Sequence, residues 1–231
     1  MRRLALTMMA GLLVAGLVGG CGPAPPRATV TVFAAASLKK TFTVIGDEFT
    51  KANPGTTIEF SFGGSSDLVT QLTQGAHADV FASADTANMD KAAKAGLVAG
   101  DPVNFASNVL TIVVAPDNPQ QITSVADLAR PGLNVVVCAP QVPCGAATRR
   151  IETLTAVSLT PVSEESSVTD VLNKVTSGQA DAGLVYVTDA IGAGDKVTVV
   201  AVPEASRAVN TYPIAVLKGA ENAAAAGEFV A

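Results

Sequence analysis

The sequence predicts an α/β fold, organised as one large domain or two modest lobes. Short runs rich in β-branched residues alternate with alanine-rich helical stretches, which is the rhythm of a parallel or mixed sheet covered by helices. The chain has 231 residues, of which 48% are hydrophobic and 15% charged, so it can bury a sizeable core. Its net charge is −5 and no run of Lys or Arg exceeds two residues, which excludes a nucleic-acid-binding surface.

The first residues have the pattern of an export signal. A basic head, Met1 to Arg3, precedes the uncharged stretch 4–20, which is marginal in length for a membrane-spanning helix. The sequence that ends at Cys21, VGGC, resembles a bacterial lipobox. We therefore expect residues 1–20 to be a lipoprotein signal peptide and Cys21 to carry a lipid anchor. Residues 21–27 are then a proline-rich tether, and the protein lies on the extracytoplasmic face of the cell membrane.

The remaining chain predicts strands and helices in alternation. The predicted strands are 29–33, 56–62, 79–83, 108–115, 133–139, 181–187, 196–202 and 212–218. The predicted helices are 38–52, 67–75, 85–95, 147–154 and 168–177. No repeat of 20 to 50 residues is visible, which excludes a solenoid. In folds of this kind, ligands bind at the carboxyl ends of the strands, where the chain turns into the helices.

Four of these strand-to-helix junctions carry small or hydroxyl-bearing residues. Ser37 stands at the expected N-cap of the first helix, and the sequence GGSSD (63–67) opens the second. The segments 140–145 and 166–170 open two later helices. Because a helix N-terminus presents unpaired N–H groups, several of them at one point would bind a small oxyanion without any Lys or Arg. Each junction taken singly is also explained as an ordinary helix cap.

Cys138 and Cys144 lie six positions apart in a chain that is expected to be exported. An oxidising compartment allows a disulfide to persist, and we expect one between these two residues. Two free, buried thiols are the alternative. A redox-active pair is less favoured, because the C-x-x-C spacing is absent.

Four segments together resemble the molybdate-binding proteins of ABC importers. They are VTVFAAASL (30–38), FGGSSDLVTQLTQGAHADVFASAD (62–85), VPCG (142–145) and GLVYVTDA (183–190). The resemblance implies a class II periplasmic-binding-protein fold, in which two α/β lobes are joined by two crossing strands and close on the ligand. The first lobe would then comprise residues 28–109 and 213–231, and the second lobe residues 110–212.

The resemblance also implies a ligand site. Ser37 and Ser65 match the serines that offer hydroxyl and backbone N–H groups from the first lobe. Cys144 and Val168 match positions that offer backbone N–H groups from the second lobe, and Tyr186 matches a tyrosine whose hydroxyl completes the cage. Their neighbours Ala36 and Ser66 are second choices. The position of Cys144 is often alanine in the family, and the family usually continues past the position of Ala231 through another helix.

From this family we expect a binding protein that captures molybdate, and also tungstate, and delivers it to an ABC permease in the membrane. It would be a monomer, catalyse nothing, use no cofactor and offer no direct cation ligands. The chemistry agrees, because a fully deprotonated dianion needs only hydrogen-bond donors, whereas protonated phosphate would leave its own O–H without an acceptor.

Three other functions stay open at this point. One is a binder of another tetrahedral oxyanion such as sulfate. The second is a thiol-disulfide protein that uses Cys138 and Cys144. The third is a hydrolase based on Ser37 or Ser65, for which a general base is hard to find, since His77 is the only histidine.

Overall fold

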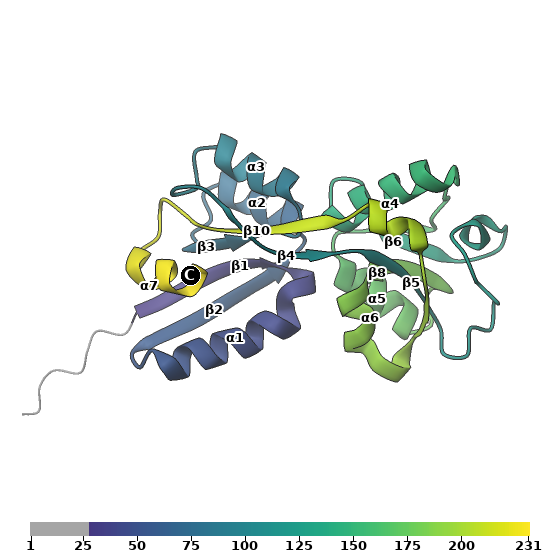
Figure 1. The fold of residues 1–231 in the computed structure, drawn as a ribbon, viewed down its shortest axis with the longest axis horizontal. Helices are drawn as coiled ribbons and strands as arrows, with labels where there is room; N and C mark the ends of the chain where they lie inside the picture. The colour runs from purple at the N-terminus through teal and green to yellow at the C-terminus, as the bar shows by residue number, and fades with distance from the viewer. Residues whose placement is uncertain (1–27) are drawn as a thin grey trace, which may run out of the picture.

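The computed structural model describes residues 28–231, which form two α/β lobes side by side (Figure 1). The predicted signal peptide (1–20), the tether (21–27) and Cys21 lie outside the described residues. Within the described part of the chain, no helix is both long and apolar enough to cross a membrane.

The first lobe is built on a five-stranded mixed sheet in the order β2-β1-β3-β10-β4. Its elements are β1 (Ala28–Ala35), α1 (Lys39–Ala52), β2 (Thr56–Gly63), α2 (Ser65–Thr73), β3 (Val80–Ala82), α3 (Thr86–Lys94), β4 (Val103–Asn108), β10 (Asn210–Val216) and α7 (Ala223–Val230). Strands β1, β2 and β3 are parallel, and β10 runs antiparallel to both β3 and β4. Helices α1 and α7 cover one face of the sheet, and α2 and α3 cover the other (Figure 1).

The second lobe repeats this plan with the order β7-β6-β8-β5-β9. Its elements are β5 (Leu110–Val114), β6 (Val135–Cys138), α4 (Pro143–Thr155), β7 (Ser163–Glu165), α5 (Val168–Thr176), β8 (Ala182–Tyr186), α6 (Val187–Ala193), β9 (Thr198–Val200) and the short 3₁₀ helix η4 (Pro203–Arg207). Strands β6, β7 and β8 are parallel, whereas β5 is antiparallel to its neighbours. Helix α4 and η4 contact one another, as do α5 and α6.

Two segments connect the lobes. The chain leaves the first lobe where β4 passes into β5 at Val109, and it returns where η4 leads into β10. At this crossing Asn210, the first residue of β10, pairs in register with Asn108, the last residue of β4. The predicted fold, two α/β lobes joined by two crossing strands, is therefore confirmed.

Apolar side chains hold each sheet to its helices. In β1, Val30 and Val32 are fully buried, and in β5 every residue is buried. On the first lobe, Phe42 of α1 packs between Phe60 of β2 and Phe229 of α7, with ring centroids about 6 Å apart. Burial of such side chains contributes roughly 1.5 to 3 kcal/mol each, which is enough to fix the helices on the sheet.

The boundaries differ from the prediction mainly at the helices. Helix α4 begins at Pro143 rather than at residue 147, because proline suits the first turn, where no intrahelical N–H bond is required. Strand β4 was not predicted. Nearly all of its side chains are exposed, so it lacks the buried apolar run that identifies the other strands. Helix α6, which follows β8 at once, was also not predicted.

Candidate anion-binding site

A small cavity lies between the two lobes, and all five predicted site residues line it. The lining comprises Ala35, Ala36, Ser37, Gly63, Gly64, Ser65, Ala84, Val142, Pro143, Cys144, Val168 and Tyr186. None of these side chains is charged at neutral pH. The cavity has a volume of only about 10 Å³, which is roughly the space that one water molecule needs.

Three helices begin at the cavity wall. Helix α2 starts at Ser65 in the first lobe, and helices α4 and α5 start at Pro143 and Val168 in the second. The first backbone N–H groups of a helix have no acceptor within that helix, and its N-terminus carries partial positive charge. Ser65 and Val168 are the first residues of α2 and α5, and Cys144 is the second residue of α4, so all three bring such N–H groups to the cavity. The wall is therefore electropositive without a cationic side chain.

The prediction that Ser37 caps the first helix is wrong. The chain first forms a 3₁₀ turn at Ala36–Leu38, and Leu38 is the N-cap of α1, with no side-chain cap bond. The hydroxyl of Ser37 instead lies 3.1 Å from the hydroxyl of Tyr212 on β10. Ser37, which lines the cavity, therefore pairs with β10 through its hydroxyl instead of capping a helix.

Ser65 has one hydrogen left to donate. Its Oγ accepts a hydrogen bond from the backbone N–H of Ala84 at 3.0 Å, and the residue is almost completely buried. Since the oxygen is the acceptor in this bond, the hydroxyl hydrogen remains available for an anion. The neighbouring Ser66 is also buried, and its Oγ has no hydrogen-bond partner among the described residues.

Tyr186 brings the second lobe's hydroxyl. It is the last residue of β8, is 1% exposed, and its Oη accepts a hydrogen bond from Asn210 Nδ2 at 2.8 Å. Burial raises the pKa of Tyr186 well above its usual value, and the nearby hydroxyl of Tyr212 and carboxylates of Asp85 and Asp189 raise that pKa further. The phenol therefore stays protonated and acts as a donor across the physiological pH range.

A disulfide joins Cys138, at the end of β6, to Cys144, in the first turn of α4. Both residues are 2% exposed, so neither offers an accessible thiol. The intervening loop is packed closely as well, because a Cβ on Gly145 would lie 2.0 Å from the carbonyl oxygen of Ala139. The bridge and the glycine together fix the loop that carries the Cys144 N–H group to the cavity wall.

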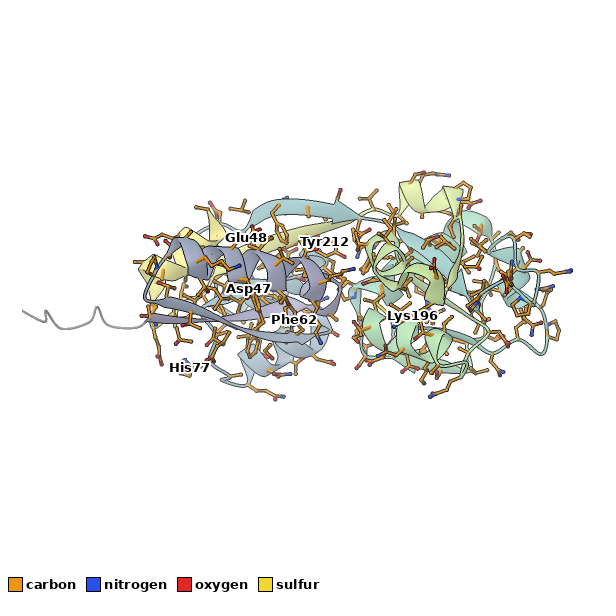
Figure 2. The ribbon with its side chains drawn as sticks, turned by 90° about the horizontal axis from the view of Figure 1, so that it is seen from below. Asp47, Glu48, Phe62, His77, Lys196 and Tyr212 are labelled. Carbon is orange, nitrogen blue, oxygen red and sulfur yellow. A yellow bond between two sulfur atoms is a disulfide. The ribbon has the colours of Figure 1, made fainter. Side chains whose placement is uncertain are left out.

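Another hollow, at the outer end of the first lobe, does not fit an anion. It has about 330 Å³ and includes His77, Asp79 and Glu221 in its lining. The Asp79 carboxylate there accepts backbone N–H bonds from Thr31 and Glu221, at 2.7 Å each, so it serves to hold the chain. Figure 2 shows His77 at this outer part of the lobe, away from the second lobe, so it cannot act as a base on Ser37 or Ser65.

Two residues behind the cavity were not predicted from the sequence. Asn210 touches Tyr186, and Tyr212, labelled near the junction of the lobes in Figure 2, touches Ser37. Both belong to β10, at the crossing that the sequence did predict. A signal existed in the segment NTYP, where polar residues begin a predicted strand, but only the fold shows that two of them contact hydroxyls of residues that line the cavity.

Known proteins resemble this chain over nearly all of its described residues. Residues 30–231 match the family described as "Bacterial extracellular solute-binding protein". The "Molybdate-binding protein ModA" of Mycobacterium tuberculosis (strain H37Rv) is 59% identical over 233 residues, covering 97% of this chain and 89% of that protein.

Solved structures give the same architecture. The periplasmic molybdate-binding protein of Azotobacter vinelandii superposes with a TM-score of 0.73 at 24% identity, covering 87% of this chain and 90% of that one. The sulfate-binding protein SubI from Mycobacterium tuberculosis H37Rv superposes with a TM-score of 0.74 at 21% identity, covering 88% and 80%. Because the two scores are nearly equal although the ligands differ, the superpositions establish the fold and not the cargo.

Proposed function

Since this chain belongs to the ModA-type bacterial extracellular solute-binding proteins, we propose that it captures molybdate between its lobes and delivers it to an ABC permease. The observation that carries the proposal is the cavity between the lobes, where neutral donors from both lobes meet. The five residues expected to bind the anion are Ser37, Ser65, Cys144, Val168 and Tyr186. The relative that is 59% identical is named for molybdate, which favours this anion over other tetrahedral oxyanions.

Donor chemistry supports a fully deprotonated anion. Serine and tyrosine hydroxyls and helix N-terminal N–H groups can all donate, and hydrogen bonds to a charged acceptor are stronger than those between neutral groups. The cavity wall carries no carboxylate that could accept a proton from the ligand. Protonated phosphate would therefore lose one hydrogen bond on entry, whereas molybdate and tungstate would lose none.

Closure supports transport. The donors come from both lobes, so a bound anion stabilises the arrangement in which the lobes are together. A permease that recognises this arrangement would accept only loaded protein. The lipid on Cys21 would keep the protein at the extracytoplasmic face of the cell membrane, near the permease. A monomer suffices, because one chain supplies the whole site.

Catalysis is disfavoured by the same geometry. Cys138 and Cys144 are bridged and buried, which removes the exposed thiolate that disulfide exchange requires. Among the described residues, no histidine, carboxylate or lysine lines the cavity beside the serines.

The test is calorimetric titration of the chain without its signal and lipidated cysteine, with molybdate, tungstate, sulfate and phosphate. Tight binding of molybdate and tungstate alone is expected. Tyr186→Phe and Ser65→Ala should each weaken binding about tenfold or more, the loss expected for one hydrogen bond to an anion, whereas the exposed Ser206→Ala should not. Sulfate binding as tight as molybdate binding would mean that the protein is not specific for molybdate. No binding of any of these anions by folded protein would refute the proposal.

A further inference from the structure

Asn210 occupies the point where the two lobes and the cavity meet. It is 1% exposed, and its side-chain amide donates to Tyr186 Oη at 2.8 Å and to the carbonyl of Ala84 at 2.9 Å. A longer contact of 3.3 Å reaches the carbonyl of Pro143. Ala84 belongs to the first lobe, whereas Tyr186 and Pro143 belong to the second, and all three line the cavity. The side-chain amide of Asn210 therefore contacts cavity-lining residues of both lobes.

Arg150 of α4 fixes which way this amide points. Its Nη2 lies 2.5 Å from Asn210 Oδ1 and also donates to the carbonyl of Ala208 at 3.3 Å. A guanidinium can only donate, so the amide oxygen must face Arg150 and the amide nitrogen must face Tyr186. The orientation of Asn210 thus follows from its neighbours' chemistry.

This orientation decides the role of the Tyr186 hydroxyl. Because Asn210 donates to Tyr186 Oη, the phenol oxygen is an acceptor in that bond and its hydrogen is left for another partner. The ring of Tyr212 packs beside that of Tyr186, with ring centroids 5.8 Å apart, and its hydroxyl contributes to the raised pKa of Tyr186. A bound dianion is a strong acceptor and would take this hydrogen.

We propose that Asn210, oriented by Arg150, is a positioning residue that keeps the Tyr186 hydroxyl a donor to the bound oxyanion. Arg150 is exposed, so solvent screens its charge, and its part is to orient the amide rather than to attract the anion. The inference rests on the proposed function, because it requires an oxyanion in the cavity.

The test is a double-mutant cycle on molybdate affinity, measured by calorimetry. Asn210→Leu keeps a similar volume but removes both hydrogen-bonding groups. In the wild-type background this substitution should weaken molybdate binding about tenfold, the loss expected when one donor to an anion is no longer held in place. In the Tyr186→Phe background, Asn210→Leu should weaken molybdate binding less than about twofold, because the hydroxyl that Asn210 positions is already absent.

Arg150→Met provides a second route that leaves the buried asparagine in place. It should weaken binding about threefold with Tyr186 present and not at all in Tyr186→Phe. Arg149→Met is the matched control, because Arg149 is the adjacent arginine of the same helix but pairs with Glu152 and Glu164 instead of Asn210. It should leave the affinity unchanged. If Asn210→Leu does not fold, the Arg150→Met cycle decides alone.

The outcomes separate the two proposals. Wild-type protein that binds none of the tested oxyanions overturns both. The positioning role is overturned if the wild-type protein binds molybdate and Asn210→Leu and Arg150→Met bind it as tightly. It is also overturned if these substitutions weaken binding equally with Tyr186 and with Tyr186→Phe. Both results leave the proposed function intact.

Discussion

Gly64 of the first lobe lies directly against Ser166 of the second, so closely that a Cβ on Gly64 would stand 2.1 Å from the Ser166 carbonyl oxygen. The obstacle is backbone, which cannot rotate away as a flexible side chain can. Gly64→Ala should therefore hold the lobes apart and weaken molybdate binding at least tenfold, although the donors themselves remain. Calorimetry measures the affinity, and small-angle X-ray scattering with ligand present should show a more open particle.

The control for this variant is Gly192→Ala. Gly192 of α6 also faces the other lobe, but a Cβ there would meet only the Lys40 side chain at an ordinary 3.8 Å. This change should leave affinity and shape unaltered. Wild-type affinity in Gly64→Ala would mean that the contact between Gly64 and Ser166 is not needed for the ligand-binding state.

The disulfide should matter more for stability than for binding. Replacing Cys138 and Cys144 by alanine together frees a short loop in the unfolded chain, which lowers the free energy of unfolding by roughly 2 kcal/mol. The Cys144 N–H group survives the change, so molybdate affinity should fall by less than about tenfold. Thermal unfolding and calorimetry on the same samples measure both effects. Complete loss of binding in the folded variant would assign the bridge a larger part in the site.

The partly buried carboxyl of Asp189 predicts a pH dependence of stability. Burial raises the pKa of Asp189 to about 7, although its hydrogen bond from the Tyr186 N–H acts in the opposite direction. Between about pH 4 and pH 7 the folded state thus keeps a proton that the unfolded state has lost. Stability is full below pH 4 and falls as the pH rises through 7, by at most about 1.4 kcal/mol per pH unit from this group.

Asp189→Asn isolates this contribution, because the amide oxygen can still accept from the Tyr186 N–H. Urea unfolding between pH 5 and 8 should show a smaller decline in the variant than in the wild type. Parallel curves for the two proteins would contradict the assignment. Carboxyls with lowered pKa, such as Asp127 at about 2, lose their effect only at lower pH and do not interfere in this range.

The hydroxyl of Ser66 predicts a different outcome from that of Ser65. Ser66 Oγ is buried and has no hydrogen-bond partner within residues 28–231, which is unfavourable in the folded state. Ser66→Ala should leave the free energy of unfolding unchanged or raise it by up to about 1 kcal/mol, with unchanged molybdate affinity. Chemical denaturation and calorimetry check the two parts. A clear loss of affinity would show that this hydroxyl, and not only that of Ser65, reaches the anion.

The sequence predicted the fold well where strands are buried. Runs such as 108–115 and 133–139 contain successive β-branched residues, and the structure buries the corresponding β5 and β6 completely. Strand β4 was not predicted because its side chains are mostly exposed. Strand β7 was not predicted because it has only three residues, two of them glutamates, which show no periodic pattern. Exposed and very short strands depend on their neighbours for pairing, which local composition does not contain.

Short sequence motifs predicted the residues that line the cavity but not the residues behind them. GSS, VPCG and GLVY each point to a residue that lines the cavity. Asn210 and Arg150, which orient the Tyr186 hydroxyl, lie 60 positions apart in the sequence and meet only through the return of the chain into β10. The expected cap at Ser37 failed for a similar reason, because its partner Tyr212 is 175 positions away.

The most direct test of the account is a crystal structure with molybdate, located by the anomalous signal of molybdenum. The account predicts one strong peak between the lobes, with oxygens within hydrogen-bond distance of the Ser37, Ser65 and Tyr186 hydroxyls and the N–H groups of Cys144 and Val168. A peak elsewhere, for example on the exposed arginines of α4, or no peak in protein that binds molybdate in solution, would contradict it.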